Sequence, residues 1–140
     1  VADIKREGCD VTIVSFGKII KEAYKAADEL EKDGISCEII DLRTVRPMDH
    51  ETILKSVKKT NRLVILEEAW PFGNIATEIT YQVQSQAFDY LDAPIIKINT
   101  ADTPAPYSPV LLEEWLPNAG DVVKAVKKVL YKLKNFDSLF

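Results

Sequence analysis

The stretch Cys37-Glu-Ile-Ile-Asp-Leu-Arg-Thr-Val-Arg-Pro-Met-Asp49 passes from an apolar run to charged residues and then to a proline. Its isoleucines and leucine supply the aliphatic bulk that a strand covered on both faces needs. Pro47 favours an extended conformation for the residue before it and ends strand pairing. Asp49 can cap a helix, because its carboxylate accepts main-chain N–H groups of the first turn. The stretch therefore predicts a buried strand, a charged connection and the start of a helix.

On both sides of this stretch, short apolar runs alternate with segments in which apolar residues recur every third or fourth position. The runs predict strands over 10–16, 37–42, 62–68 and 94–98, and the periodic segments predict helices over 18–33, 49–59, 73–87 and 121–132. Segment 2–6 is polar and suits only an edge strand, while three prolines make 102–109 a loop. Because parallel strands need crossover connections, the alternation predicts a three-layer α/β/α sandwich around a mostly parallel sheet.

Composition is that of one globular domain. The chain has 140 residues, of which 46% are hydrophobic and 29% charged. The formal net charge of -4 gives no electrostatic reason to expect nucleic acid or an anionic membrane as a partner. The first residue is Val1 rather than methionine, in a segment patterned like a strand, so we expect a processed product or a fragment of a longer protein.

The two cysteines, Cys9 and Cys37, are far apart and lie in or beside apolar runs, without Cys-x-x-Cys spacing. We therefore expect two buried thiols in a reducing compartment rather than a disulfide or a metal pair. No signal peptide or membrane-length apolar run is present in these 140 residues.

Ligands of open parallel sheets bind beyond the carboxyl ends of the strands. In this chain that edge is expected to gather Ser15-Phe16-Gly17, Arg43 to Arg46, Glu67-Glu68 and 99–102. Opposite charges there suit either a substrate site or an ion-pair network that fixes this domain against another. We favour the network, which makes Arg43, Arg46, Glu67 and Glu68 candidate assembly residues.

Other candidates have ordinary structural interpretations. The turn at Ser15 opens a helix but lacks any glycine-rich phosphate motif, so a tight turn is favoured over phosphate binding. His50 is expected on the surface, because no second histidine or cysteine cluster gives metal spacing and no serine motif gives a triad. Trp70 and Phe72 follow a strand directly, and such aromatics favour packing or an interface over base stacking. The residues alone assemble no catalytic, cofactor or metal site.

Several motifs, taken in order along the chain, resemble the C-terminal domain of transketolase-like thiamine enzymes. They are Asp41-Leu-Arg-Thr-Val-Arg-Pro-Met-Asp49, Lys58-Lys-Thr-Asn-Arg-Leu-Val64, Glu67-Glu-Ala-Trp-Pro-Phe-Gly73, Phe88-Asp-Tyr-Leu-Asp-Ala-Pro94 and Asp102-Thr-Pro-Ala-Pro-Tyr107. Within that family the motifs are most similar to those of pyruvate dehydrogenase beta subunits. The resemblance extends from Ala2 to about Lys132, which predicts a transketolase C-terminal-like domain over 1–132 and a tail over 133–140 that is expected to be flexible.

The resemblance implies a mixed sheet of about five strands whose first strand is antiparallel. It also implies a parent heterotetramer that decarboxylates pyruvate on thiamine diphosphate with magnesium and passes the acetyl group to a lipoyl arm. The cofactor motifs of that family lie outside this chain, so the fragment alone is expected to be inactive and to bind no cofactor. Implied partners are an alpha subunit, a second beta subunit and the peripheral subunit-binding domain of the acyltransferase core, in a bacterial cytoplasm or a mitochondrial matrix.

Two alternatives stay open at this point. Related beta subunits serve branched-chain 2-oxo acid and acetoin dehydrogenases. A free-standing ligand-binding or signalling α/β domain is also compatible with the length. A response-regulator receiver, however, needs an aspartate ending a middle strand and a lysine after the last, where this chain has Glu67 and Asn99.

Overall fold

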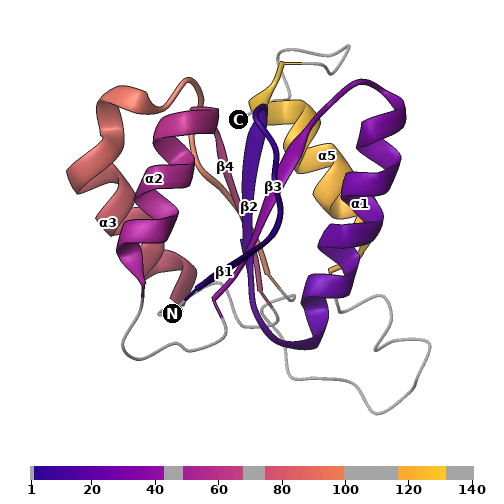
Figure 1. Ribbon diagram of the computed structural model, residues 1–140, viewed down its shortest axis with the longest axis horizontal. Helices are drawn as coiled ribbons and strands as arrows, with labels where there is room; N and C mark the ends of the chain where they lie inside the picture. Colours follow the sequence, from indigo (N-terminus) through magenta and orange to yellow (C-terminus); the bar gives the residue numbers. More distant parts are fainter. Residues whose placement is uncertain (1, 43–48, 68–74, 100–116, 132–140) are drawn as a thin grey trace.

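The computed structural model describes residues 2–42, 49–67, 75–99 and 117–131 (Figure 1). Its strands are β1 (Asp3–Arg6), β2 (Val11–Ser15), β3 (Cys37–Asp41), β4 (Leu63–Leu66) and β5 (Ile96–Ile98). Its helices are α1 (Ile20–Lys32), α2 (His50–Thr60), α3 (Ile75–Ala87) and α5 (Ala119–Val129), with short 3-10 turns η1 (Gly17–Ile19) and η2 (Phe88–Tyr90). Each predicted strand and helix is present. The predicted loop over 102–109 and the tail over 133–140 lie outside the described residues.

The strands form one five-stranded sheet in the order β1-β3-β2-β4-β5. β1 pairs with β3 in the antiparallel sense, and the other neighbours are parallel. The predicted mostly parallel sheet with an antiparallel edge strand is therefore confirmed. In the register, Ser15 at the end of β2 lies beside Asp41 of β3 and Leu66 of β4, so the carboxyl ends of three strands meet at one edge.

Helices cover both faces of the sheet, with α1 and α5 on one side and α2 and α3 on the other (Figure 1). Side chains of β2 alternate between the two resulting cores: Ile13 packs in the cluster with α1 and α5, and Val14 in the cluster with α2 and α3. Both side chains are fully buried. Alternating burial on two faces is what the continuous apolar strands predicted.

Helix ends follow the capping residues of the sequence. The Asp49 carboxylate caps α2 by accepting the Thr52 N–H at 3.1 Å, and Asn61 ends that helix in the left-handed conformation with φ 66°. Helix α5 starts at Ala119, two residues before the predicted start. The reason is a reciprocal capping box in which Asn118 and Asp121 each bind the other's main-chain N–H.

The expectation of two buried thiols is correct for Cys37 and wrong for Cys9. Both cysteines are free, and Cys9 is exposed in the turn between β1 and β2. Cys37 lies in the core between the sheet and α1, where burial raises the pKa of its thiol to about 12. Cys37 is therefore a protonated core residue at neutral pH, and Cys9 is the accessible thiol.

Candidate functional site

Polar residues from four strands lie at the carboxyl edge of the sheet, and three of them, Ser15, Glu67 and Asn99, were predicted there. Ser15 ends β2, Asp41 ends β3, Glu67 follows β4 and Asn99 follows β5. The main-chain N–H of Glu67 also donates to the carbonyl oxygen of Ile98 at 3.0 Å, which extends the β4–β5 pairing past the end of β4. The other candidate residues, Arg43, Arg46, Glu68, Trp70 and Phe72, lie outside the described residues, and their assembly role stays a prediction.

Glu67 is a fully buried carboxyl group at the amino end of α3. Its Oε1 accepts a hydrogen bond from Asn99 Nδ2 at 2.6 Å, and the carboxylate also accepts the main-chain N–H of Ala76. Burial raises the pKa of Glu67, although the two hydrogen bonds and the nearby Lys97 ammonium oppose that shift. Glu67 thus joins β4, β5 and the start of α3 inside the domain.

Two buried polar atoms at this edge have no hydrogen-bond partner in the structure's described part: Ser15 Oγ and Glu67 Oε2. The alternation along β2 places Ser15 on the same face as Ile13, whereas the Ala76 contact places Glu67 on the face covered by α3. A buried polar group without a partner costs about 1–3 kcal/mol. The edge is therefore polar and incompletely satisfied on both faces by the described residues.

The raised pKa of Glu67 predicts that Glu67→Gln stabilises the domain at neutral pH. A carboxyl whose pKa is higher in the folded state favours folding when protonated, and loses that contribution as the pH rises through the folded pKa. The glutamine keeps an oxygen for Asn99 and Ala76 and removes the buried charge. Urea unfolding at pH 7 should show a gain in the free energy of unfolding, and the gain should shrink as the pH falls toward the ordinary pKa of a glutamate. A loss of stability at pH 7 would contradict this assignment.

At the opposite, amino edge of the sheet lies a buried polar network that the sequence analysis did not foresee. Glu38 of β3 is 1% exposed, and its carboxylate accepts Ser56 Oγ–H at 2.5 Å and the Gly8 N–H at 3.3 Å. It also pairs with the ammonium group of Lys59, whose side chain is 49% exposed. Thr12 Oγ1 of β2 lies 2.7 Å from Ser56 Oγ and 2.6 Å from Thr60 Oγ1. The network joins β2, β3 and α2.

The number of hydroxyl hydrogens determines which group donates and which accepts in this network. Its three hydroxyl groups carry one hydrogen each, yet they face four acceptor contacts, because Thr60 Oγ1 also lies 3.1 Å from the carbonyl oxygen of Arg62. That carbonyl already accepts the Thr12 N–H at 2.9 Å. The Glu38 carboxylate, paired with Lys59, can only accept. The three hydrogens then form three of the four hydrogen bonds: Thr60 donates to Thr12, Thr12 to Ser56 and Ser56 to Glu38. The contact with the Arg62 carbonyl oxygen is left without a hydrogen. The hydroxyl chain is thus oriented toward the carboxylate, which indicates a structural lock between sheet and helix.

His50 lies in the first turn of α2, partly exposed, and lines an open groove between α2 and α3. Within the described ranges, no three histidine, cysteine or acidic residues are grouped so that they would hold a metal ion. None of the helices that the structure describes is long and apolar enough to cross a membrane. The polar carboxyl edge of the sheet is therefore the main candidate site among the described residues.

Comparison with known families decides which protein class this architecture represents. The family model for the transketolase C-terminal domain matches residues 1–122. The chain belongs to this family. A split-gene transketolase described as an inactive beta4 tetramer has the same fold, with a TM-score of 0.83, 30% identity, and coverage of 94% of this chain and 42% of that one. A 2-oxoglutarate:ferredoxin oxidoreductase from Magnetococcus marinus shares the fold alone, with a TM-score of 0.63 and 13% identity.

Curated relatives of this transketolase C-terminal domain are pyruvate dehydrogenase E1 component beta subunits. The one from Rhizobium meliloti (strain 1021) is 56% identical over 131 residues, which are 94% of this chain and 28% of the relative. Those from Rickettsia felis and Bacillus subtilis are 52% and 45% identical, covering 93% and 92% of this chain and 40% and 39% of the relatives. The resemblance drawn from the motifs is confirmed. The chain spans well under half the length of these relatives.

Proposed function

We propose that this chain is the assembly and docking domain of a pyruvate dehydrogenase beta subunit, within an enzyme that decarboxylates pyruvate on thiamine diphosphate and transfers the acetyl group to lipoamide. The identity of 56% with the Rhizobium meliloti E1 beta subunit, over nearly the whole chain, carries this proposal. The chain contributes a folded scaffold with two complete cores, and the covalent chemistry belongs to polypeptide beyond these 140 residues.

The residues of the described part do not fit the thiamine diphosphate and magnesium that such an enzyme needs. Mg²⁺ prefers several oxygen ligands, usually carboxylates with substrate phosphates. The carboxyl edge offers the buried Glu67, one oxygen of which is already bound by the Asn99 amide, and the described ranges hold no cluster of three metal-ligating side chains. We therefore place the cofactor in the parent enzyme and derive no catalytic step on this chain.

Assembly is the role we propose for the carboxyl edge. Its partners would be an alpha subunit, a second beta subunit and the peripheral subunit-binding domain of the acyltransferase core. The residues proposed to make these contacts are Arg43, Arg46, Glu67, Glu68, Trp70 and Phe72. For Glu67 the contribution would be indirect, since its carboxyl is fully buried and holds the start of α3 against β5. The exposed contacts would then come from the neighbouring charges and aromatics.

A domain exchange tests this function. The matching 131 residues of the Rhizobium meliloti beta subunit are replaced by this chain, and the chimera is produced with that organism's alpha subunit. We expect an assembled enzyme that decarboxylates pyruvate at a rate close to that of the parent, and an inactive isolated chain. An assembled chimera that prefers a branched-chain 2-oxo acid or acetoin would contradict the substrate assignment. Turnover by the isolated chain would contradict the division of labour.

Arg46→Glu in the same chimera tests the assembly residues. Reversing one charge of an interdomain ion pair replaces an attraction by a repulsion, so the assembled fraction should fall about tenfold at physiological salt. The midpoint of thermal unfolding of the isolated chain should stay nearly unchanged. Lys25→Glu, on the exposed face of α1, is the matched control and should assemble normally. Equal assembly by both variants would remove Arg46 from the interface.

A further inference from the structure

The helix α3 and the turn η2 carry three exposed aromatic side chains and few charged ones. Tyr81, Phe88 and Tyr90, here called the aromatic patch, are 64%, 66% and 45% exposed. Only Glu78 and Asp89 are charged among residues 75–90, whereas α2 alone carries Glu51, Lys55, Lys58 and Lys59. Exposed tyrosine and phenylalanine with few charges are the composition of a buried contact rather than of a solvated helix face.

A groove of about 510 Å³ adjoins the aromatic patch. It is lined by His50, Glu51, Leu54, Lys55 and Lys58 of α2 and by Gln86 of α3. The Lys58 ammonium lies 5.3 Å from the ring centroid of Tyr90, so the groove and the patch meet at that pair. Lys55 and Lys58 line the groove together with the apolar Leu54 and outnumber the one lining acid, Glu51, which suits a segment that combines apolar side chains with an acidic residue.

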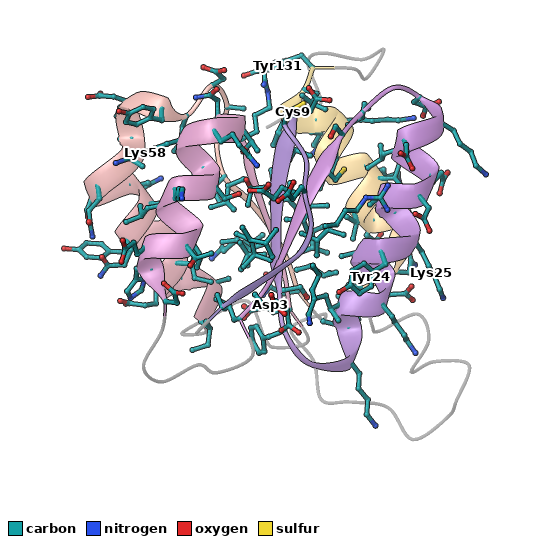
Figure 2. The ribbon with its side chains drawn as sticks, viewed as in Figure 1. Asp3, Cys9, Tyr24, Lys25, Lys58 and Tyr131 are labelled. Carbon is teal, nitrogen blue, oxygen red and sulfur yellow. The ribbon has the colours of Figure 1, made fainter. Side chains whose placement is uncertain are left out.

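The end of α5 leads the chain toward this surface. The Tyr131 hydroxyl donates to the main-chain oxygen of Asp92, two residues after Tyr90, at 3.4 Å. Arg62 Nε donates to the carbonyl oxygen of Val129 at 3.0 Å, which holds the last turn of α5 near the same segment. In Figure 2, Tyr131 lies at the top of the molecule and Lys58 at its upper left. Residues after 131 therefore start near the aromatic patch.

Residues 132–140 read Lys-Leu-Lys-Asn-Phe-Asp-Ser-Leu-Phe, with four large apolar side chains, two lysines near the start and one acidic residue, Asp137. Nine extended residues reach up to about 30 Å, enough to extend from α5 to the groove. We propose that this segment docks on its own domain, with Phe136 and Leu139 on the aromatic patch and Asp137 toward Lys55 and Lys58. Tethering raises the local concentration of the segment into the millimolar range, which favours it over a free partner of similar chemistry.

The test compares the 140-residue chain with a variant ending at Tyr131 and with a 140-residue Phe136→Ser/Leu139→Ser variant. Lysine acetylation is followed residue by residue by mass spectrometry, together with amide chemical shifts. Loss of docking should speed acetylation of Lys58 about threefold and shift the amides of 54–58 and 86–92 in both variants. Lys25, exposed on α1 beside Glu22, is the internal control and should react at the same rate throughout.

Exchanging the charges of Asp137 and Lys58 is the more specific part of the test. Asp137→Lys should expose Lys58 as truncation does, and Lys58→Glu in the same chain should restore the shifts of 86–92. Identical amide shifts at 54–58 and 86–92 for the 140-residue and shortened chains would overturn the proposal. Shifts that depend on protein concentration, with a doubled mass in light scattering, would overturn it in favour of a second copy on the aromatic patch. Lys58 protection that appears only after the alpha subunit is added would overturn it in favour of that subunit.

Discussion

Gly8→Ala is expected to lower the free energy of unfolding by about 3 kcal/mol or more, because the added methyl group has no space. A Cβ at Gly8 would lie 2.3 Å from the carbonyl carbon of Cys37, 2.5 Å from its oxygen and 2.6 Å from the Glu38 nitrogen. All three are main-chain atoms, so no side chain can rotate away. The connection between β1 and β2 must move off β3, and the hydrogen bond from the Gly8 N–H to Glu38 is weakened with it.

Gly17→Ala is the matched control for this effect. Gly17 has φ +73°, but a Cβ there would meet nothing within 4 Å. Its cost comes from backbone conformation alone and should be about 1 kcal/mol. Urea unfolding followed by circular dichroism measures both variants. Domains are typically stable by about 5–15 kcal/mol. The Gly8 variant should therefore either give a measurable urea unfolding curve or be partly unfolded at room temperature without urea. Equal losses for the two variants would show that Gly8 matters only for its backbone freedom.

Gly8 also shows where sequence reasoning stops. Composition and periodicity predicted the strands, the helices and the parallel sheet, because those depend on local patterns such as the apolar run that ends at Leu42. The close approach of Gly8 to Cys37 depends on how β1 returns across β3, which no local pattern encodes. Cys9 was misjudged for the same reason: it comes two residues before the apolar run that starts at Val11, but it is exposed in the turn between β1 and β2.

The candidate site was predicted in part. The position of Glu67 and Asn99 at one edge followed from the rule that parallel strands end together, and their 2.6 Å hydrogen bond agrees with it. The Glu38 network was missed, because Thr12 meets Ser56 and Thr60 across 44 and 48 positions of sequence. Only the register of β2 against α2 brings these hydroxyls together. One indication of the network was visible in the sequence, the charged Glu38 inside an otherwise apolar strand.

Lys59→Met is the second change for which we expect a large effect, a loss of about 3 kcal/mol in the free energy of unfolding at pH 7. The methionine keeps the packing of the lysine stem but leaves the Glu38 carboxylate, 1% exposed, without its cation. Lys55→Met on the exposed face of the same helix is the control, and should change stability by less than about 0.5 kcal/mol. Similar losses for the two would mean that the buried carboxylate does not depend on Lys59.

Adding Glu38→Leu to Lys59→Met should recover most of that loss. Without the carboxylate, three hydroxyl hydrogens and three contacts remain. The hydrogen bonds can then reverse direction, so that Ser56 donates to Thr12, Thr12 to Thr60, and Thr60 to the Arg62 carbonyl oxygen. A leucine fills the space with apolar atoms, as replacements of buried ion pairs tolerate. The double variant is measured by urea unfolding beside both single variants. The contrary outcome is that the double variant loses as much free energy of unfolding as the two single variants together, or more. In that case the buried pair stabilises the domain through more than charge compensation, and the proposed reversal of the hydroxyl hydrogen bonds is wrong.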